Sequence, residues 1–178
     1  MDTLAGQILI VSGSPGSGKT TIAAALARLP GCNKVHLHSD DFWGYIGTGH
    51  IDPWLPEADA QNHMIMQIAA EVAALYARKG YLVALDGVIR PWALEFYKTL
   101  GVPSHYMVLR TSVEEAVARC QARGGDSLTD PVVVADLHAQ FTGLGAFERH
   151  VLAVDGLDQA ATLEAVKAGF ASGAYRLN

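Results

Sequence analysis

The sequence predicts an α/β fold in which a five-stranded parallel sheet carries helices on both faces. Short apolar runs rich in β-branched residues alternate with helical segments along the chain, and a glycine-rich loop joins the first such run to the first helix. Parallel strands need crossover connections, and right-handed crossovers place the helices on both faces of the sheet. At 178 residues the chain has the size that one core supports, so we expect a single domain, 1–178.

The first part of the chain provides two strands, one helix and a long loop. Residues 7–12 (QILIVS) are an apolar run typical of a strand buried on both faces. Residues 20–29 are alanine-rich and end before a Pro-Gly pair, which predicts a helix with a clear stop. Residues 34–38 (KVHLH) are expected as the second strand. Residues 42–58 contain three glycines, two prolines and four aromatic residues without periodicity, so we expect a long, partly ordered loop that selects the acceptor.

The rest of the chain continues the alternation. Three more strands are expected, at 81–85, 105–109 and 151–154. Helices are expected at 59–79, 91–100, 112–123, from 129 or 130 to 141, and 158–170. Ser112 and Glu115 have the spacing of a capping box, and Pro131 fits the first turn of the following helix.

Composition excludes several classes of protein. Half of the residues are hydrophobic and 17% are charged, which is too apolar for a disordered chain, and no apolar run reaches the length of a membrane span. The start carries Asp2 and no Lys or Arg, unlike a secretory signal. Cys32 and Cys120 lack the spacing of a zinc site, so we expect reduced thiols in a cytoplasmic protein. A net charge of -5 with dispersed Lys and Arg argues against a nucleic-acid partner and for a small-molecule acceptor.

A phosphate-binding motif carries the strongest functional signal. Residues 13–20 (GSPGSGKT) match GxxxxGK[ST] between a predicted strand and a predicted helix, a context that argues against a mere glycine-rich turn. Glycines let backbone N–H groups converge on phosphate oxygens at the start of the helix. Lys19 is expected to bridge the β- and γ-phosphates of ATP, and the Thr20 hydroxyl to bind Mg²⁺. The expected nucleotide-binding residues are Gly13, Ser14, Pro15, Gly16, Ser17, Gly18, Lys19, Thr20 and Thr21.

Three aspartates follow two of the predicted strands, at the edge of the sheet where α/β folds bind ligands. Asp40 and Asp41 follow the second strand, and Asp40 is the preferred base for the acceptor hydroxyl, with Asp41 beside the substrate. Asp86 ends the third strand, as expected of a carboxylate that holds Mg²⁺ directly or through water. Aspartates also cap helices and build turns, and that reading stays open for all three.

Arginines and aromatic residues are candidates for phosphate and acceptor contacts. Arg119 and Arg123 lie four residues apart on one predicted helix and could clamp the transferring phosphate, or form a solvated helix face. Arg90 could meet the acceptor or lie at the surface. Four aromatic residues could line an acceptor pocket, or they could pack the long loop onto the domain: Phe42, Trp43, Tyr45 and Trp54. The seven histidines form no ligand set, so packing or surface roles are expected, with His38 or His63 as the exception.

Five motifs in this order, GSPGSGKTT, HSDDFW, LDG, RCQARGG and HVLAVD, resemble the small P-loop kinases, most closely the chloramphenicol phosphotransferase-like and zeta-toxin-like group. Polynucleotide kinase domains, gluconate kinases and shikimate kinases are kin of that group. The resemblance implies a three-layer P-loop NTPase fold with strand order 2-3-1-4-5. It also implies catalysis by Asp40, a lid at about 124–130 served by Arg119 and Arg123, and an adenine loop near Asp155. The HP-containing motif of gluconate kinases and the triple glycine of shikimate kinases are absent.

These features together predict an ATP- and Mg²⁺-dependent phosphotransferase that acts on a hydroxyl of a small molecule. Two alternatives stay open. One is a kinase for nucleic-acid 5'-hydroxyls or nucleotide sugars, and the other is an ATP-binding sensor without an acceptor.

Overall fold

Five parallel strands form one sheet in the order β2-β3-β1-β4-β5 in this computed structural model, which describes residues 4–123 and 129–177. Parallel pairing places Ile10 of β1 between Leu85 of β3 and Tyr106 of β4. The sheet order predicted from the resemblance is therefore confirmed. The strands are β1 (Ile8–Ser12), β2 (Lys34–His38), β3 (Leu82–Asp86), β4 (Ser104–Arg110) and β5 (Val151–Ala153).

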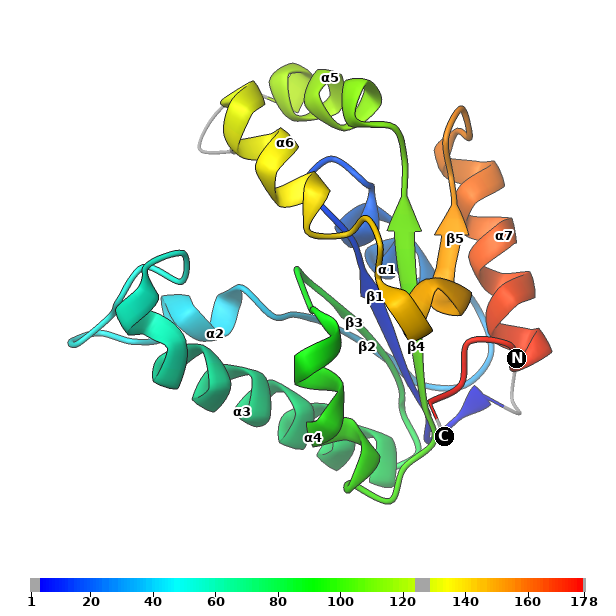
Figure 1. Ribbon diagram of the computed structural model, residues 1–178. Coiled ribbons are helices and arrows are strands. Elements are labelled where there is room, and N and C mark those ends of the chain that lie inside the picture. The colour runs from blue at the N-terminus through cyan, green and yellow to red at the C-terminus, as the bar shows by residue number, and fades with distance from the viewer. Residues whose placement is uncertain (1–3, 124–128, 178) are drawn as a thin grey trace.

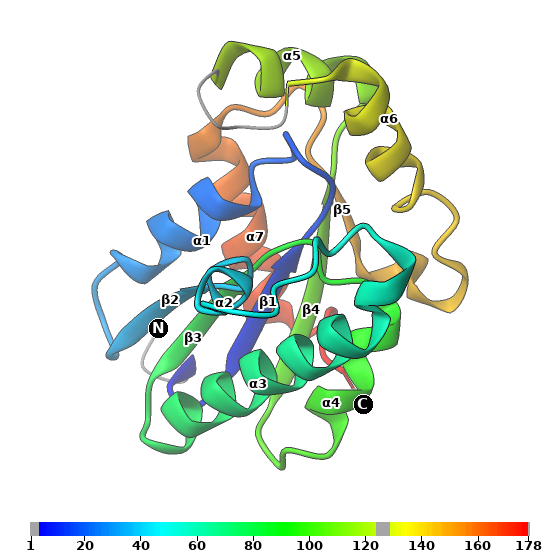
Figure 2. The ribbon, with the colours of Figure 1, turned by 90° about the vertical axis from the view of Figure 1, so that its left-hand side faces the viewer.

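Helices cover both faces of the sheet, as Figures 1 and 2 show. The α-helices are α1 (Lys19–Ala27), α2 (Asp41–Gly44), α3 (Asp59–Arg78), α4 (Leu94–Lys98), α5 (Val113–Arg123), α6 (Pro131–Ala139) and α7 (Gln159–Ser172). Short 3₁₀ turns lie at Pro56–Ala58, Pro91–Ala93 and Gly145–His150. With α3 and α4 on one face and α1 and α7 on the other, the molecule has the three layers of the predicted fold.

Successive side chains of a strand point to opposite faces of the sheet, so an apolar core lies on each face. Ile8 and Ile10 of β1 face the core under α3 and α4, whereas Leu9 and Val11 face the core under α1 and α7. All of β1 is buried, as expected of a strand in the middle of a parallel sheet. The carboxyl ends of β1, β2 and β3 therefore meet at one edge on a rigid support.

The segment 42–58 is more regular than the sequence predicted. Instead of a loop throughout, it begins within α2 and ends in a 3₁₀ turn. The amide of Phe42 donates to the Ser39 carbonyl, and the amide of Tyr45 donates to the Asp41 carbonyl. A single turn of four residues is too short to produce a hydrophobic period, so the sequence pattern could not reveal it.

Two other expectations concern the lid and the membrane. Most of the predicted lid, 124–128, lies outside the described residues. Within 4–123 and 129–177, no helix combines the length and the apolar character needed to cross a bilayer.

The helix expected from 129 or 130 begins after Asp130, whose carboxylate accepts hydrogen bonds from the amides of Val132 and Val133.

Candidate active site

The glycine-rich loop between β1 and α1 is shaped by close contact with neighbouring backbone. A Cβ on Gly13 would lie 2.5 Å from the Leu109 carbonyl oxygen, and one on Gly16 would lie 2.3 Å from the Ala116 carbonyl oxygen. Gly16 also has a φ of 78°, which glycine adopts at little cost. These positions therefore need glycine. The loop brings its amides to the start of α1, where the helix dipole favours an anion.

Lys19 is the first residue of α1 and is almost fully buried beside the loop. Its Nζ donates to the Ser14 carbonyl oxygen at 3.3 Å. Burial lowers the pKa of Lys19, while the negative charges of Asp40 and Asp86 oppose that effect and the positive charge of Arg123 adds to it. The two carboxylates and Arg123 therefore lie close enough to Lys19 to act on its ammonium group.

Asp86 is fully buried at the end of β3, and both of its carboxylate oxygens have polar partners. The Thr20 hydroxyl donates to Asp86 Oδ2 at 2.6 Å, His38 Nδ1 lies 3.1 Å from the same oxygen, and His36 Nε2 lies 2.5 Å from Oδ1. Burial alone raises the pKa of Asp86, but the hydrogen bonds from His36, His38 and Thr20 outweigh burial and hold the pKa well below its usual range. The carboxylate is therefore ionised at neutral pH.

The contacts of His36 and His38 with Asp86 are the part of the site that the sequence did not predict, although His38 is among the expected exceptions to packing or surface roles. Both lie on one face of β2, and the β2–β3 register places His36 beside Ala84 and His38 beside Asp86. Their hydrogen bonds to Asp86 depend on strand pairing. The available signal was an HxH pattern ending one strand and an aspartate ending its neighbour, but it becomes informative only once the strand order is known.

Asp40 follows β2 and is exposed, in contrast to Asp86. Its Oδ2 lies 3.6 Å from His38 Nε2, and its Oδ1 accepts a hydrogen bond from the Ser39 hydroxyl at 3.2 Å. The hydrogen bond with Asp86 raises the pKa of His38, against the opposing effect of burial, and the charge of Asp40 raises it further. His38 thus connects the buried carboxylate to the exposed one. Asp41 lies in the first turn of α2 and is exposed.

The donor set fits a magnesium-bound nucleotide. Thr20 Oγ1 and Asp86 Oδ2 are hard oxygen atoms in direct contact, and Mg²⁺ binds proteins through one or two such groups together with phosphate oxygens. The buried Ser17 hydroxyl, inside the loop, has no hydrogen-bond partner among residues 4–123 and 129–177. Thr20 and Asp86 would hold the metal, and the loop amides with Lys19 would hold the phosphates.

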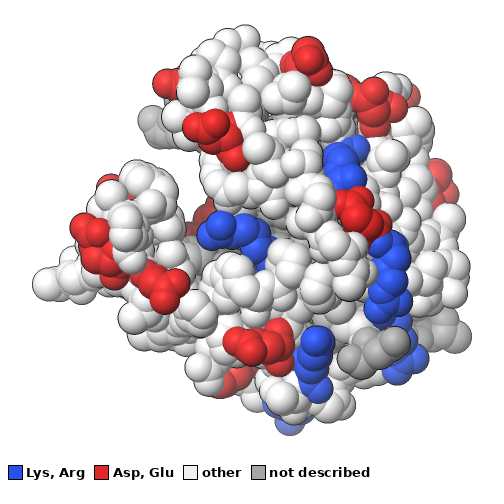
Figure 3. Space-filling model, viewed as in Figure 1, with Lys and Arg blue, Asp and Glu red and all other residues white. Residues whose placement is uncertain are grey.

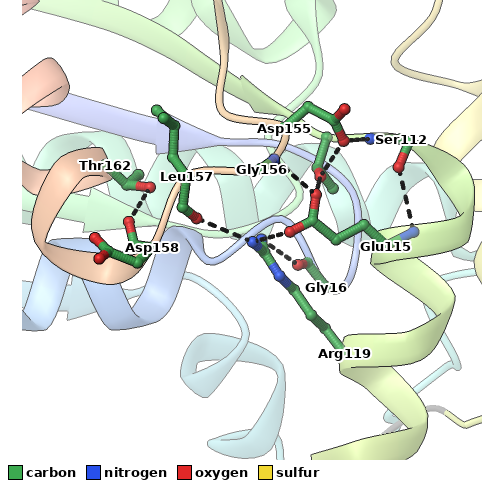
Figure 4. A network of polar contacts seen from close by, with 10 residues as sticks. Gly16, Ser112, Glu115, Arg119, Asp155, Gly156, Leu157, Asp158 and Thr162 are labelled. Atoms are coloured by element: carbon green, nitrogen blue, oxygen red, sulfur yellow. Dashed lines mark hydrogen bonds and ion pairs between the residues drawn. The ribbon is translucent and has the colours of Figure 1, made fainter.

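Arg119 belongs to a polar network that joins α5, the glycine-rich loop and the loop after β5 (Figure 4). Its guanidinium donates to the Gly16 carbonyl oxygen at 3.4 Å and to the Leu157 carbonyl oxygen at 3.3 Å, and it forms an ion pair with Glu115. Glu115 also accepts from the amide of Gly156 at 3.2 Å. The network therefore ties α5 to both the phosphate loop and the loop after β5.

The predicted capping box at the start of α5 is half formed. The amide of Glu115 donates to the Ser112 hydroxyl at 3.3 Å, as expected. The Glu115 carboxylate does not return to the Ser112 amide, because that amide donates to Asp155 Oδ1 at 2.9 Å instead. Asp155 is thus placed after β5 beside the start of α5, next to the network of Arg119.

The remaining candidates are more dispersed. Arg90 donates to the Gln140 side chain at 2.9 Å, across the space between the end of β3 and α6. Trp43 packs against the core and donates to Asn62 Oδ1 at 3.1 Å. The Phe42 ring meets the Tyr45 ring edge to face. Trp54, by contrast, is 75% exposed.

Gly87, directly after Asp86, carries a prediction about the stability of the site. A Cβ at Gly87 would lie 1.7 Å from Ser39 Oγ and 2.9 Å from Ser39 Cβ. Rotation of the hydroxyl removes only the first clash, so the ends of β2 and β3 must separate. We expect Gly87→Ala to lower the free energy of unfolding by about 1–3 kcal/mol in urea denaturation. Gly44→Ala is the control, since within the described residues that added Cβ would meet no atom within 4 Å beyond its chain neighbours and the backbone of its own helix. Equal stability of both variants would contradict the prediction.

Comparisons with known proteins agree with this fold. The chain is similar to a gluconokinase from Sinorhizobium meliloti 1021, with a TM-score of 0.69 and 17% identity over 94% of this chain and 93% of the other. It is similar to the Deinococcus radiodurans tunicamycin resistance protein, with a TM-score of 0.67 and 20% identity over 92% and 95%. It is also similar to a chain of the Pnkp1/Rnl/Hen1 RNA repair complex, with a TM-score of 0.55 and 24% identity over 75% and 43%.

At these identities the solved structures show the fold alone, and a comparison with curated proteins found no match. The family model described as an AAA domain matches residues 8–144, a span that includes the glycine-rich loop, Asp40 and Asp86. Because the match covers more than half of the chain, the protein is a member of this AAA domain family, AAA_33.

Proposed function

We propose that the protein transfers the γ-phosphoryl group of Mg²⁺-bound ATP to a hydroxyl group of a small molecule. One observation carries the proposal. Lys19, Thr20 and Asp86 converge at the end of the glycine-rich loop, and the exposed carboxylate of Asp40 lies close enough for its negative charge to oppose the lowering of the Lys19 pKa by burial. A phosphate group and an acceptor hydroxyl would meet between these residues.

Each residue has a role that its position supports. The loop amides and Lys19 bind the phosphates, and bound Mg²⁺ supplies charge that neutralises them. Asp40 accepts the proton of the acceptor hydroxyl. At the same time the hydroxyl oxygen forms a bond to the γ-phosphorus, and the bond from that phosphorus to the leaving oxygen of ADP breaks. Asp40 suits this task because it is exposed and an acceptor can reach it. Asp86, buried and engaged, suits the metal instead.

The structural neighbours support a small acceptor, since one is described as a gluconokinase. The RNA repair neighbour favours a second candidate, phosphorylation of a nucleic-acid 5'-hydroxyl. The formal net charge of -5 opposes that candidate, because phosphate-rich partners bind basic surfaces. Binding of a 5'-hydroxyl oligonucleotide that weakens steeply with salt would favour the second candidate over the first.

The test of the proposed function has two stages. Isothermal calorimetry first measures uptake of Mg²⁺·ATP by folded protein. A panel of hydroxyl-bearing metabolites and antibiotics is then screened for compounds that accelerate ADP release, with phosphorylated product identified by mass spectrometry. Absence of nucleotide uptake would refute the proposal at its first step.

Lys19 provides a sharper prediction within the first stage. We expect Lys19→Met to weaken Mg²⁺·ATP binding about 10- to 100-fold, because a charge-assisted hydrogen bond to phosphate is lost. Lys79→Met is the charge-matched control, because Lys79 ends α3 just before the start of β3, whereas the glycine-rich loop follows the carboxyl end of the parallel strand β1. Calorimetry measures both variants. Unchanged affinity in the Lys19 variant would show that the ammonium group does not contact phosphate.

A further inference from the structure

We propose that His36 and His38 are positioning residues of the magnesium site, which hold the Asp86 carboxylate in the orientation that a nucleotide-bound Mg²⁺ needs. This inference rests on the proposed function, in which Thr20 and Asp86 hold the metal. Both histidines contact Asp86 through a ring nitrogen, but each uses a different one. His36 Nε2 lies 2.5 Å from Asp86 Oδ1, and His38 Nδ1 lies 3.1 Å from Asp86 Oδ2.

The contacts are divided between the two oxygens of the carboxylate. His36 occupies Oδ1, whereas Oδ2 accepts a hydrogen bond from the Thr20 hydroxyl at 2.6 Å and lies beside His38. A carboxylate offers about four lone-pair positions, so these partners leave room for a metal ion. Because Oδ1 and Oδ2 are held separately, the plane of the carboxylate is fixed and Oδ2 stays beside Thr20.

The pairing of β2 with β3 explains why both rings reach the same side chain. In this register His38 lies beside Asp86 and His36 lies beside Ala84. Because side chains alternate between the faces of a strand, all of these residues share one face of the sheet. Ala84 is buried and small, which leaves room for the His36 ring to reach along β3 to Asp86. Beyond the end of β2, the amide of Ser39 donates to the Asp86 carbonyl oxygen at 2.8 Å and keeps His38 in register.

Asp86 depends on protein partners for its orientation. Figure 3 shows other Asp and Glu side chains spread over the surface, where water can solvate them. The Asp86 side chain is 0% exposed, and those of His36 and His38 are 25% and 29% exposed. The two rings lie on the side of β2, the edge strand of the sheet. Partners of this kind orient a metal ligand, and their loss typically lowers metal affinity about 10- to 100-fold.

The histidines serve the carboxylate and not the metal itself. In the part of the chain that the structure describes, no group of three His, Cys, Asp or Glu side chains is arranged to hold a metal ion. Mg²⁺ also prefers oxygen ligands to imidazole. Each ring instead has a nitrogen beside an Asp86 oxygen, as the outer partner of a ligating group does.

The use of different ring nitrogens allows a crossed test by substitution. The amide nitrogen of Asn lies as many bonds from Cα as Nδ1 of His, and that of Gln lies as many as Nε2. His36→Gln and His38→Asn therefore keep a donor where the ring nitrogen was, whereas His36→Asn and His38→Gln do not. Metal affinity is the readout, because His38 Nε2 also lies 3.6 Å from Asp40 and a change in rate would combine both contacts.

Calorimetry measures the affinity of the unaltered protein and of these variants for AMP-PNP, once with excess Mg²⁺ and once with EDTA. The ratio of the two dissociation constants is the metal enhancement. We expect His36→Asn and His38→Gln to lower the metal enhancement about tenfold, and His36→Gln and His38→Asn to retain it within about threefold. Affinity in EDTA should change much less, because the glycine-rich loop is unaltered.

The crossed pattern separates positioning from a general structural role. Equal losses of metal enhancement in the Asn and Gln variants of one position would mean that the ring only fills space, and no loss in any variant would mean that Asp86 keeps its orientation without the histidines. Either result would overturn the inference, as would unaltered protein that binds AMP-PNP equally with and without Mg²⁺. Affinity in EDTA identifies a variant that has lost its fold, and the variants of the other position then decide. Unaltered protein that takes up no AMP-PNP in either buffer would instead refute the proposed function.

Discussion

Asp40→Asn is expected to reduce phosphoryl transfer about 10²- to 10⁴-fold while leaving Mg²⁺·ATP affinity within about twofold. The amide keeps the shape of the carboxylate and its contact with the Ser39 hydroxyl but is a far weaker base. Nucleotide binding is expected to persist because the loop amides, Lys19 and Thr20 hold the phosphates. Steady-state kinetics with an identified acceptor and calorimetry with Mg²⁺·ATP measure the two effects separately.

Asp41→Asn is the matched control, because it removes the same charge from the neighbouring exposed position. We expect its rate to fall by much less, since Asp41 begins α2 whereas Asp40 lies 3.6 Å from His38 at the end of β2. If Asp41→Asn were the inactive variant, the base would be reassigned to Asp41. Full activity in both variants would refute a carboxylate base at this edge of the sheet.

The fold followed from local patterns because each pattern has a direct physical cause. The run 7–12 is apolar throughout because β1 is buried on both faces, and the glycines at 13 and 16 are required by backbone only 2.5 and 2.3 Å from their missing Cβ atoms. Asp86 was expected at the end of β3, where the structure has it in contact with Thr20. In these cases one segment and its immediate neighbours determine the structure.

The parts that could not be predicted depend on contacts between distant segments. His36 and His38 bind Asp86 across 50 and 48 residues of sequence, and only the β2–β3 register brings them together. Arg119 donates to the Gly16 carbonyl, 103 residues away in the sequence. Its helical spacing from Arg123 therefore does not predict which group its guanidinium contacts. The fourth contact of this kind, Asp155 with the Ser112 amide, replaced an arm of a capping box that local spacing had predicted.

Asp86→Asn is expected to lower the free energy of unfolding by about 3–5 kcal/mol near neutral pH, because it leaves two histidines beside a buried amide in place of a carboxylate. The depressed pKa of Asp86 stabilises the fold above that group's ordinary value of 3.8, and this contribution is lost as the pH falls toward the depressed pKa. The raised pKa of His38 stabilises the fold below its ordinary value of 6.5, and this contribution is lost as the pH rises through the raised pKa.

Both pH effects act through one carboxylate, so they should disappear together. Urea denaturation of the unaltered protein across the pH range should show stability declining on the acid side and again as the pH rises from 6.5 through the raised pKa of His38. In Asp86→Asn both declines should flatten, because the amide has no charge for His36 or His38 to pair with. Asp136→Asn, on the surface helix α6, is the control and should reproduce the unaltered pH curve. A different outcome would be a stability curve of Asp86→Asn that lies below that of the unaltered protein but keeps the same shape. In that case the histidines of the unaltered protein would be neutral hydrogen-bond partners of the Asp86 carboxylate and not charges paired with it.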